Sequence, residues 1–393
     1  MQTVILAAGR GTRMGPVTAQ LPKPMLPVGG TPIAARVAES ALEAGSDELL
    51  FVTGYMGETI RDYFGDEYRG APVKYATQDS PSGTADALRA VSDLIDDRFA
   101  LLNGDNVYDP AGLRSLFSSG PSIGVHEVDD PTSYGVVSVE DGQVVDIVEK
   151  PDDPPSSLAN AGAYVFPYEV TNYLDVPQSE RGEYELTDVV ARLLEEYRLA
   201  PVELDRWLDV GRPWELLEAN SLLMADQPRA LDGEIHPSAT IRGNVVVEAG
   251  ATIEPGVTIE GPVLVRAGST VGPNAYVRGS TTIGEDVRIG HSVEIKNSQI
   301  MSGTNVPHLS YVGDSVLSGD VNFGAGTVVA NVRHDDEPVE LTVKGDRVST
   351  GRRKFGVVVG PGVKTGIGTE LCPGVTLSTG ATTEPGETVF RDR

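Results

Sequence analysis

The chain has 393 residues, of which 57 are acidic and 31 are basic, and its formal net charge is −26. A chain of this length is longer than one that ordinarily folds around a single hydrophobic core, so we predict two domains. No apolar stretch is long enough to span a membrane. The acidic charge argues against nucleic-acid and anionic-membrane partners, and the single cysteine, Cys372, excludes an internal disulfide. Because an apolar run begins almost at Met1, we expect no signal peptide and a cytoplasmic protein.

The acidic residues are spread along the whole chain, and only seven of the basic residues are lysines. Concentrated salt screens the self-repulsion of such a surface. We therefore predict a halophilic protein that unfolds at a higher temperature in molar KCl than in dilute buffer. Thermal unfolding at the two salt concentrations measures this, and equal midpoints would contradict the interpretation.

Short apolar runs alternate with helix-like segments up to about Gln227. This alternation predicts an open α/β sheet with βαβ crossovers, in which ligands bind at the carboxyl ends of strands. The runs that predict strands are Thr3–Ala7, Glu48–Thr53, Val73–Ala76, Phe99–Leu102 and Ile123–Glu127. The segments that predict helices are Pro32–Ala44, Gly57–Phe64 and Thr84–Leu94.

The loop after the first predicted strand is rich in glycine. The segment Leu6–Pro27 reads LAAGRGTRMGPVTAQLPKPMLP. A backbone with few side chains can turn successive N–H groups toward a polyphosphate, and the basic residues add positive charge beside it. An ordinary strand-to-helix turn with solvent-facing basic residues is the alternative. The glycines are Gly9, Gly11 and Gly15, and the basic residues are Arg10, Arg13 and Lys23.

Two isolated carboxylates follow other predicted strands. Asp105 follows the buried run Phe99–Leu102, and Asp209 lies in the apolar run Trp207–Val210. Acidic residues in such places are frequent Mg²⁺ ligands in phosphate chemistry, although Asp105 also suits a turn. The loop from Gln78 to Thr84 carries an amide that could contact a nucleobase edge, and a helix cap is the alternative.

A hairpin is predicted through Asp141-Gly142, which is a good turn pair. Its ends carry Gly135 and the acid–base pair Glu149–Lys150, and Asn160 opens the next strand. These groups suit a hydroxyl-rich ligand, although Glu149–Lys150 could equally be an exposed ion pair. Further on, Thr187 is predicted to cap a helix, and another helix is predicted over Pro213–Ala225.

The character of the sequence changes after a linker without periodicity, residues 228–234. Aliphatic residues then recur at every sixth position from Ile235 to Met301 without a miss. This is the hexapeptide repeat of a parallel β-helix, in which each aliphatic side chain points into a narrow core. The period breaks near Ser302–Ser310, resumes at Tyr311, is interrupted by the polar insert Arg333–Phe355, and returns from Val359.

The first break in the repeat contains His308. It could be an ordinary surface-loop residue. However, cations, a phenol and amides occur on what should be adjacent coils, and these groups suit the binding of a phosphorylated ligand. They are Arg278, Lys296, Tyr311, Asn322 and Asn331.

The segment Leu6–Pro27 resembles the signature of sugar-1-phosphate nucleotidylyltransferases. Nearly the whole chain resembles the archaeal bifunctional sugar-1-phosphate nucleotidylyltransferase/acetyltransferases. The resemblance implies a Rossmann-like nucleotidyltransferase domain, residues 1–227, followed by a left-handed parallel β-helix acetyltransferase domain, residues 235–393. It also implies Mg²⁺ as cofactor, acetyl-CoA as co-substrate, and a homotrimer or a dimer of trimers.

The resemblance also implies a role for each matching residue. Arg13 and Lys23 would neutralise the phosphates, Asp105 and Asp209 would hold Mg²⁺, and His308 would take the proton from the attacking amine. The nucleotide would be held by Leu6, Ala8, Gly9, Gly11, Thr12, Gln78, Gly83 and Thr84. The sugar phosphates would be held by Gly135, Glu149, Lys150, Asn160 and Gly162 in the first domain and by Arg278, Lys296, Tyr311, Asn322 and Asn331 in the second. Ala325 would contact acetyl-CoA.

The chain departs from the resembling family after Asn331. Relatives usually carry a basic residue there for acetyl-CoA, whereas this chain has the acidic run Asp335-Asp336-Glu337. Arg333, Lys344 or the cluster Arg352–Lys354 could substitute. Two alternatives stay open: a monofunctional glucose-1-phosphate uridylyl- or thymidylyltransferase with a structural β-helix, and a non-catalytic regulatory subunit.

Overall fold

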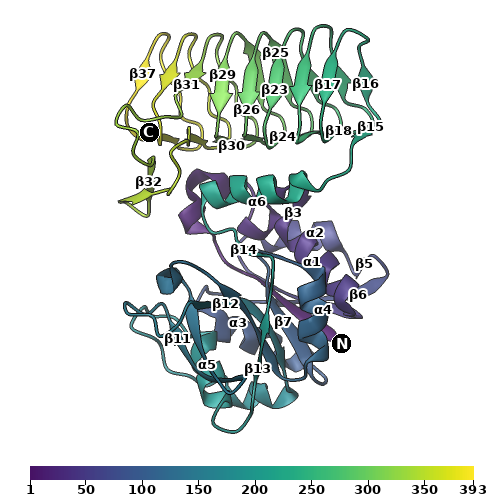
Figure 1. The fold of residues 1–393 in the computed structure, drawn as a ribbon, viewed down its shortest axis with the longest axis vertical. Helices are drawn as coiled ribbons and strands as arrows, with labels where there is room; N and C mark the ends of the chain where they lie inside the picture. The colour runs from purple at the N-terminus through teal and green to yellow at the C-terminus, as the bar shows by residue number, and fades with distance from the viewer. The chain divides into compact units, whose positions relative to one another are not determined.

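The computed structural model describes all residues, Met1–Arg393. The chain forms two compact units, which are described separately (Figure 1). The first unit contains residues 1–10, 22–26 and 32–209, and the second contains residues 11–21, 27–31 and 210–393. The glycine-rich loop therefore contributes to both units. The predicted limits of the two domains and of the linker, 1–227, 228–234 and 235–393, remain a prediction about the chain's two modules.

The first unit is built on a mixed sheet in the strand order β11-β10-β12-β7-β1-β4-β6-β5, with β9 and β13 joined at its side. The strands β1, β4, β6 and β7 are parallel, whereas β12 runs antiparallel to β7. The strands are β1 (Gln2–Ala7), β4 (Glu48–Thr53), β5 (Glu67–Tyr68), β6 (Ala71–Thr77), β7 (Phe99–Asn103), β9 (Ser122–Glu127), β10 (Gly135–Glu140), β11 (Gln143–Glu149), β12 (Leu158–Phe166) and β13 (Ala200–Glu203).

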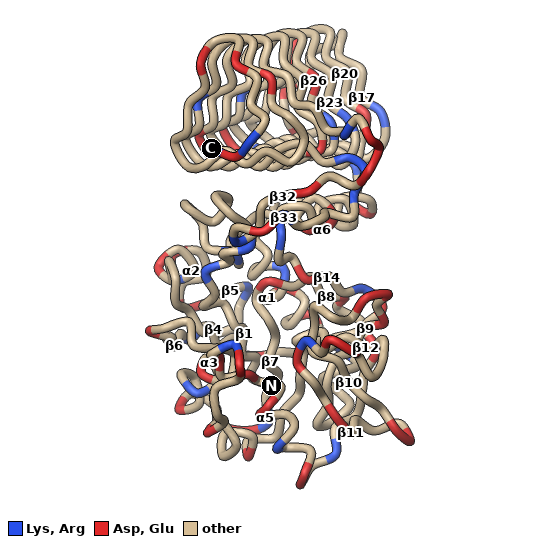
Figure 2. Tube along the Cα trace, turned by 90° about the vertical axis from the view of Figure 1, so that its left-hand side faces the viewer, with Lys and Arg blue, Asp and Glu red and all other residues tan.

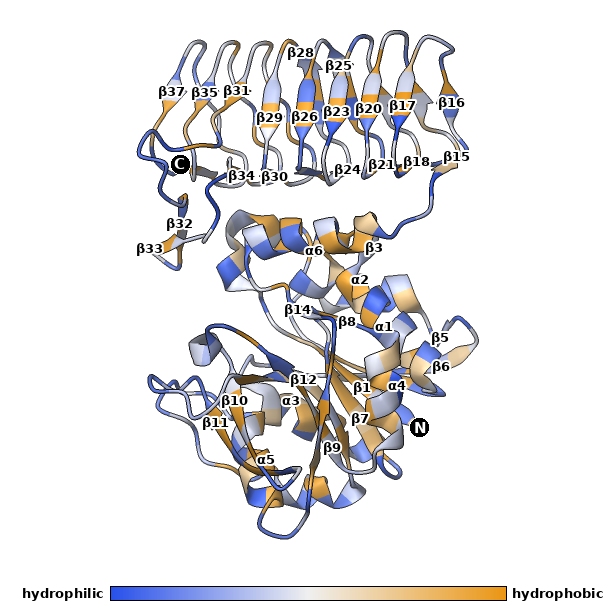
Figure 3. Ribbon diagram, in the orientation of Figure 1, coloured by the Kyte–Doolittle hydropathy of each residue, from blue (hydrophilic) through white to orange (hydrophobic).

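Helices flank this sheet because the central strands are apolar on both faces (Figure 3). The middle of β4, for example, is wholly buried from Leu49 to Val52. The predicted α/β alternation is confirmed, and most boundaries agree within two residues. The helices are α1 (Ile33–Ala44), α2 (Gly57–Phe64), α3 (Thr84–Val91), α4 (Pro110–Ser118) and α5 (Leu186–Leu193), with short 3₁₀ helices at η2 (Lys23–Met25), η3 (Ser92–Leu94), η4 (Pro131–Ser133) and η5 (Tyr168–Tyr173).

The prediction that Thr187 caps helix α5 is wrong. The helix begins at Leu186, and Glu185 occupies the N-cap position without a capping hydrogen bond from its side chain. Thr187 lies inside the helix, where its hydroxyl is buried and has no hydrogen-bond partner. Packing of the apolar residues Leu186, Val189 and Val190 into the core decides where the helix starts, rather than the capping preference of threonine.

Most of the second unit consists of three parallel sheets whose strands alternate along the chain (Figure 1). Paired residues such as Thr252 and Thr270 are eighteen residues apart, or three hexapeptides. This arrangement is consistent with a parallel β-helix. One sheet contains β15 (Ala230–Leu231), β18 (Val245–Val247), β21 (Val263–Val265), β24 (Thr281–Ile283), β27 (Gln299–Ile300), β30 (Val316–Leu317), β34 (Val358–Val359) and β36 (Thr376–Leu377). The second sheet contains β16 (Glu234–Ile235), β19 (Thr252–Ile253), β22 (Thr270–Val271), β25 (Arg288–His291) and β28 (Asn305–His308). The third contains β17 (Thr240–Arg242), β20 (Thr258–Glu260), β23 (Tyr276–Arg278), β26 (Glu294–Lys296), β29 (Tyr311–Gly313), β31 (Val328–Val329), β35 (Glu370–Leu371) and β37 (Thr388–Val389).

The phase of the repeat changes earlier than the sequence suggested. Ile283 pairs with Ile300, only seventeen residues further on. Ile300, and not Met301, therefore continues the buried core. In β29, Val312 rather than Tyr311 occupies the inward position, paired with Ile295. The predictions for Met301 and Tyr311 are wrong by one residue, because a coil shortened by one residue turns the following side chains to the opposite face. Tyr311 thereby points away from the core.

Part of the predicted linker, residues 228–234, already forms strands. Strand β15 already pairs with β18 at Ala230–Val246, and β16 pairs with β19 at Glu234–Thr252. These first coils carry few aliphatic residues, and the six-residue period therefore becomes visible only at Ile235. Upstream, helix α6 (Pro213–Ala225) matches its prediction and belongs to the second unit.

The second unit also contains the middle of the glycine-rich loop, Gly11–Leu21, and the polar insert. The loop forms the kinked 3₁₀ helix η1 (Thr12–Ala19) and the short strand pair β2 (Pro27–Val28) and β3 (Thr31–Pro32). The insert forms the hairpin of β32 (Glu340–Val343) and β33 (Asp346–Ser349). Acidic residues are distributed over both units (Figure 2), and none of the helices is long and apolar enough to cross a membrane.

Candidate functional site

Two carboxylates and an ammonium group meet in the first unit. The Nζ atom of Lys23 lies 2.5 Å from Oδ2 of Asp105 and 3.6 Å from Oδ1 of Asp209. Asp105 follows β7, and Asp209 ends β14 (Trp207–Asp209), which pairs with β8 (Asn106–Tyr108) so that Asp209 lies opposite Asn106. This small strand pair brings together two acids that are more than a hundred residues apart in the chain.

The lysine at this site is unusually buried. Lys23 has only 4% of its surface exposed, and it lies in a rigid Pro-Lys-Pro turn. A buried ammonium is costly unless opposite charges compensate it, and the two carboxylates do so here. The side chains of Asp105 and Asp209 retain 31% and 20% exposure, so their remaining oxygens can reach a ligand.

The same two carboxylates fit a divalent cation. They already converge on one positive group, the Lys23 ammonium. No group of three or more His, Cys, Asp or Glu side chains suited to a metal occurs in the chain. Mg²⁺ is commonly held by one or two carboxylates together with substrate phosphates. The donor set therefore suits a magnesium ion that arrives with a polyphosphate.

The glycine-rich loop leaves its backbone open at Gly9, where an added Cβ atom would meet no atom within 4 Å. Gly9 comes shortly after Leu6 and directly after Ala8. The carbonyl of Leu6 accepts a hydrogen bond from the N–H of Gly104, and the carbonyl of Ala8 accepts one from the N–H of Tyr55. Gly11 adopts the left-handed conformation (φ 63°) and precedes the 3₁₀ helix that begins with Thr12 and Arg13. The open backbone is compatible with N–H groups that face an anion, and the binding of a phosphate here stays a prediction.

The predicted base-contacting loop is held by its own hydrogen bonds. The side-chain amide of Gln78 donates to the carbonyl of Gly83 at 2.9 Å and to Asp86 at 3.0 Å. The hydroxyl of Thr84 accepts from the backbone N–H of Leu186. Gln78 is buried, and the two hydrogen bonds that its amide nitrogen donates join it to the loop and to the first turn of α3. In this structure Gln78 and Thr84 therefore shape the loop.

Gly83 lies against the neighbouring segment of the chain. Its φ is +119°, and an added Cβ atom would lie 2.3 Å from the carbonyl oxygen of Tyr184. We predict that Gly83→Ala destabilises the protein by about 2–4 kcal/mol and raises the KM for nucleotide, because backbone must move. Urea unfolding and initial-rate kinetics measure the two effects.

Gly120 provides the matched control for this prediction. It also has a positive φ, +77°, but nothing lies within 4 Å of its added Cβ atom. Gly120→Ala should therefore cost only about 1 kcal/mol of backbone strain. Equal losses in the two variants would show that the contact with Tyr184 does not matter.

The predicted sugar-phosphate residues of the first domain gather around one ion-pair cluster. Glu149 contacts Lys150 at 3.0 Å and also lies 3.6 Å from Arg181, which pairs with Glu185 at 2.8 Å. Sequence reasoning missed Arg181 and Glu185, because the loop that carries them has no recognisable period. Gly135 pairs with Glu149 across the hairpin, and an added Cβ atom there would lie 3.4 Å from Asn160.

Asn160 and Gly162 lie where β12 is irregular. The side-chain amide of Asn160 donates to the hydroxyl of Tyr164 at 2.6 Å, and its oxygen accepts from the N–H of Gly162 at 3.0 Å. The pairing of β12 with β9 shifts register between Asn160 and Tyr164. Such irregularities re-aim side chains near functional sites. The structure thus brings Gly135, Glu149 and Asn160 together.

Four residues predicted for the second site lie on one face of the second unit. Arg278 and Lys296 are paired in register on β23 and β26, and Tyr311 lies on β29. Asn331 follows β31, and its amide lies 3.3 Å from the hydroxyl of Tyr311. Burial raises the pKa of Tyr311, and the nearby carboxylates of Asp314 and Glu294 raise it further.

Sequence reasoning missed Asp314 at this face. Its carboxylate accepts hydrogen bonds from Lys296 at 2.7 Å and from Asn331 at 2.5 Å. Asp314 follows Gly313 in a stretch of turn-like composition, and the sequence offered no signal that it is buried. Its exposed fraction is only 3%.

His308 lies in the neighbouring sheet, at the end of β28. It is exposed, and it pairs in register with His291 of the coil before it. Asn322 lies in line with this sheet through its bridge to Asn305, and the carbonyl of Ala325 accepts a hydrogen bond from Gly368. No hydrogen bond or ion pair joins the ring of His308 to the cluster of Lys296, Tyr311 and Asn331 within one copy of the chain.

The acidic run after Asn331 is paired with the basic residues that could have replaced the family's cation. Arg333 contacts Asp335 at 2.5 Å, and Arg353 contacts Asp336 at 2.6 Å. These pairs are exposed, so each is worth little in free energy. They nevertheless show that Arg333 and Arg353 already pair with the acidic run.

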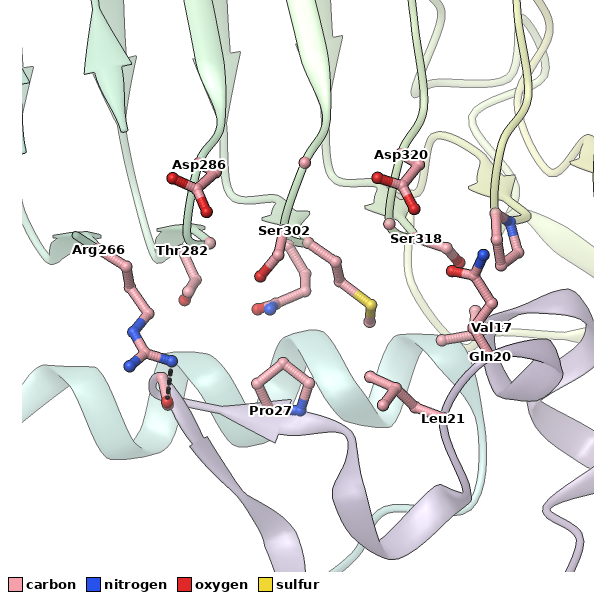
Figure 4. Close-up of a pocket in the computed structure, with 17 residues that line it drawn as sticks. Val17, Gln20, Leu21, Pro27, Arg266, Thr282, Asp286, Ser302, Ser318 and Asp320 are labelled. Carbon is pink, nitrogen blue, oxygen red and sulfur yellow. Dashed lines mark hydrogen bonds between the residues drawn. The ribbon is translucent and has the colours of Figure 1, made fainter. Parts of the chain in front are cut away.

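A cavity of about 610 Å³ lies within the second unit (Figure 4). Val17, Leu21 and Pro27 form an apolar side, and Asp286 and Asp320 lie at its edge. Gln299 and Ser318 also line it, and each has a buried polar atom without a hydrogen-bond partner. Water can satisfy such atoms in a polar cavity of this size. None of the predicted site residues lines this cavity.

Comparison with known proteins places both units. The family model described as Nucleotidyl transferase matches residues 2–226, and the one described as GMPPB C-terminal domain matches residues 259–365. The crystal structure of UDP-glucose pyrophosphorylase complexed with UDP-glucose has a TM-score of 0.52 and 26% sequence identity, and the match covers 56% of this chain and 96% of that chain.

Similar full-length proteins cover almost the entire chain. The bifunctional protein GlmU of Methanococcus vannielii is 41% identical, over 95% of this chain and 91% of that protein. The bifunctional sugar-1-phosphate nucleotidylyltransferase/acetyltransferase of Sulfurisphaera tokodaii is 38% identical, over 100% of this chain and 98% of that protein. The chain therefore belongs to the nucleotidyl transferase family and, over nearly its full length, to the group of bifunctional GlmU-like sugar-1-phosphate nucleotidylyltransferase/acetyltransferases.

Proposed function

We propose that this enzyme carries out two reactions. One transfers a nucleotidyl group from UTP or dTTP to a sugar 1-phosphate and releases pyrophosphate. The other N-acetylates an amino-sugar 1-phosphate, of glucosamine or galactosamine, with acetyl-CoA. Together they give nucleotide sugars such as UDP-N-acetylglucosamine. The observation that carries the first reaction is the contact of Lys23 with both Asp105 and Asp209.

The first reaction is an in-line displacement at phosphorus. A phosphate oxygen of the sugar 1-phosphate attacks the α-phosphorus of the nucleotide, and pyrophosphate leaves. This chemistry needs positioning and charge neutralisation rather than a covalent intermediate. Arg13 and Lys23 supply the positive charge, and the open backbone at Gly9–Thr12 holds the triphosphate. Mg²⁺, held by Asp105 and Asp209, would neutralise the phosphate oxygens when it is bound.

The rest of the first site holds the base and the sugar. The loop from Gln78 to Thr84 borders the base, while Gly135, Glu149, Lys150, Asn160 and Gly162 contact the sugar phosphate. Lys150 and Arg181 flank Glu149 in the structure, so the sugar hydroxyls meet a carboxylate whose position is fixed by two cations. Uridine is favoured as the base, since the similar solved structure is complexed with UDP-glucose.

The second reaction transfers an acetyl group to an amine. The amine nitrogen attacks the carbonyl carbon of the thioester, and His308 accepts the proton that the nitrogen loses. The C–S bond then breaks, and the leaving thiolate of coenzyme A takes this proton to give the free thiol. An imidazole titrates near neutrality and suits this task. Arg278 and Lys296 bind the sugar phosphate, Tyr311, Asn322 and Asn331 hold the amino sugar, and Ala325 borders acetyl-CoA.

The second site also implies an assembly. His308 is in another sheet than Lys296 and Tyr311, and no hydrogen bond or ion pair within one chain joins them. We propose a left-handed β-helix that assembles as a homotrimer or as a dimer of trimers, in which residues of neighbouring subunits complete the site. We also propose a cytoplasmic location and no nucleic-acid or membrane partner, in keeping with the net charge of −26.

Two assays on one preparation in molar KCl test these proposals. The first measures pyrophosphate release from a panel of nucleotides and sugar 1-phosphates. The second measures free thiol released from acetyl-CoA in the presence of glucosamine or galactosamine 1-phosphate. We expect both products. Pyrophosphate without thiol would favour the monofunctional alternative, and neither product would favour a regulatory subunit.

A further inference from the structure

A carboxylate that none of the proposed steps uses lies at the centre of the second site. One oxygen of Asp314, Oδ2, accepts hydrogen bonds from Nζ of Lys296 at 2.7 Å and from Nδ2 of Asn331 at 2.5 Å. Its other oxygen, Oδ1, accepts from Nδ2 of Asn297 at 2.7 Å. Its side chain is only 4% exposed. Lys296 and Asn297 belong to the coil before Asp314, and Asn331 belongs to the coil after it.

The backbone position of Asp314 does not explain this carboxylate. Asp314 lies at a corner of its coil with φ 52°, and Asp286 and Asp320 occupy corners of the same kind with φ 54° and 59°. Those two residues are exposed. Asn297 serves at the corner just before Asp314, with φ 45° and no charge. A corner therefore requires neither burial nor a negative charge, and at Asp314 both need another reason.

The strand before Asp314 is shaped to let the other site groups reach it. A Cβ atom added to Gly313 would lie 2.5 Å from the hydroxyl of Tyr311 and 2.7 Å from Nδ2 of Asn331. The side chains of Tyr311 and Asn331 thus meet directly above the bare backbone of Gly313. Lys296 lies opposite Gly313 in the parallel register and reaches Asp314 from the other side.

We propose that Asp314 is a positioning residue of the acetyl-transfer site, whose buried carboxylate holds Lys296 and Asn331 where they meet the amino-sugar phosphate. This inference rests on the proposed acetyl transfer. A lysine side chain loses much rotational freedom when it is fixed, and a buried, charge-assisted hydrogen bond fixes it before the substrate arrives. Lys296 still has two N–H groups for the phosphate, since an ammonium has three donors.

Asp314→Asn separates the role of the charge from the role of the corner. Asparagine accepts the left-handed conformation, and its oxygen can still accept from Asn297. Its nitrogen would then face Lys296 and Asn331, which are donors themselves. We expect the KM for the amino-sugar 1-phosphate to rise about 10- to 100-fold. We expect the KM for acetyl-CoA to change less than about threefold, and nucleotidyl transfer to stay unchanged.

A double-variant cycle distinguishes positioning from general stability. If Asp314 acts through Lys296, then Asp314→Asn should add little to the loss already caused by Lys296→Met. Asp320→Asn, at an exposed corner with similar φ, is the matched control and should leave both activities unchanged. Additive losses, or an equal rise in both KM values, would overturn the proposal.

Further readouts cover the remaining outcomes. Asp314→Ser is tested as a second variant beside Asp314→Asn. Thermal unfolding and nucleotidyl transfer report whether each of the two variants folds. Loss of both activities in both variants would make Asp314 a structural residue instead. If the native enzyme released no thiol at all, the proposed acetyl transfer itself would fail. A crystal structure of Asp314→Asn would then decide the positioning role, because Lys296 and Asn331 must be displaced in it and unchanged positions would refute it.

Discussion

Lys23→Met should lower nucleotidyl transfer about 1,000-fold while leaving acetyl transfer intact. The ammonium of Lys23 lies 2.5 Å from Asp105 and 3.6 Å from Asp209, and removing one group that stabilises developing charge typically costs this much in rate. Methionine keeps most of the volume of the buried lysine stem, so the fold should survive. Pyrophosphate release and thiol release, measured on the same sample, test both halves of this expectation.

The same variant should bind a divalent cation more tightly when no nucleotide is present. In the native chain the lysine already neutralises part of the negative charge of the two carboxylates, and any cation that arrives meets this competition. Titration with Mn²⁺, followed by electron paramagnetic resonance, measures the affinity without turnover. Lys74→Met is the matched control, because Lys74 is exposed and pairs with Glu48 at 2.7 Å, away from Asp105. Unchanged Mn²⁺ affinity in Lys23→Met would contradict a metal site at these two carboxylates.

His308→Ala should lower acetyl transfer about 100- to 10,000-fold, the range typical of a lost general base. Nucleotidyl transfer should be unaffected, since His308 lies in the repeat of the second unit. His291 offers a close control, because it pairs in register with His308 on the preceding coil and is likewise exposed. Thiol release by His291→Ala should match that of the native enzyme. Equal losses in the two variants would indicate a general effect on this sheet rather than proton transfer by His308.

The sequence predicted most of the elements that hold the site. Hydrophobic period and turn chemistry are local signals, and they located β4, α2, α6 and the turn at Asp141-Gly142. The last of these indeed has both residues at positive φ, 48° and 74°. The carboxylates Asp105 and Asp209 were recognised as isolated acids next to apolar strands. Their meeting at Lys23 depends on the pairing of β8 with β14, which is a long-range contact that no local pattern encodes.

The errors have a common physical origin. The sequence predicts that the six-residue period runs to Met301 and resumes at Tyr311. Methionine suits an inward position as isoleucine does, and tyrosine suits one as valine does, so the period alone does not tell which residue faces the core. The coil is one residue shorter there, so Ile300 and Val312 fill the core. Asp314 was missed for a related reason. Its burial depends on Lys296 and Asn331 of the neighbouring coils, and a period shows only that coils stack, not which polar groups meet between them.

One measurement tests most directly whether a single chain performs both reactions at separate sites. Glucosamine 1-phosphate, acetyl-CoA and UTP are incubated with the native enzyme, with Asp105→Asn, with His308→Ala, and with a mixture of the two variants, and the products are identified by mass spectrometry. The native enzyme should give an acetylated nucleotide sugar. Asp105→Asn should stop at the acetylated sugar phosphate, His308→Ala should give no acetylated product, and the mixture should restore the acetylated nucleotide sugar. Failure of the folded variants to restore it, or loss of both reactions from either single change, would contradict two separate sites.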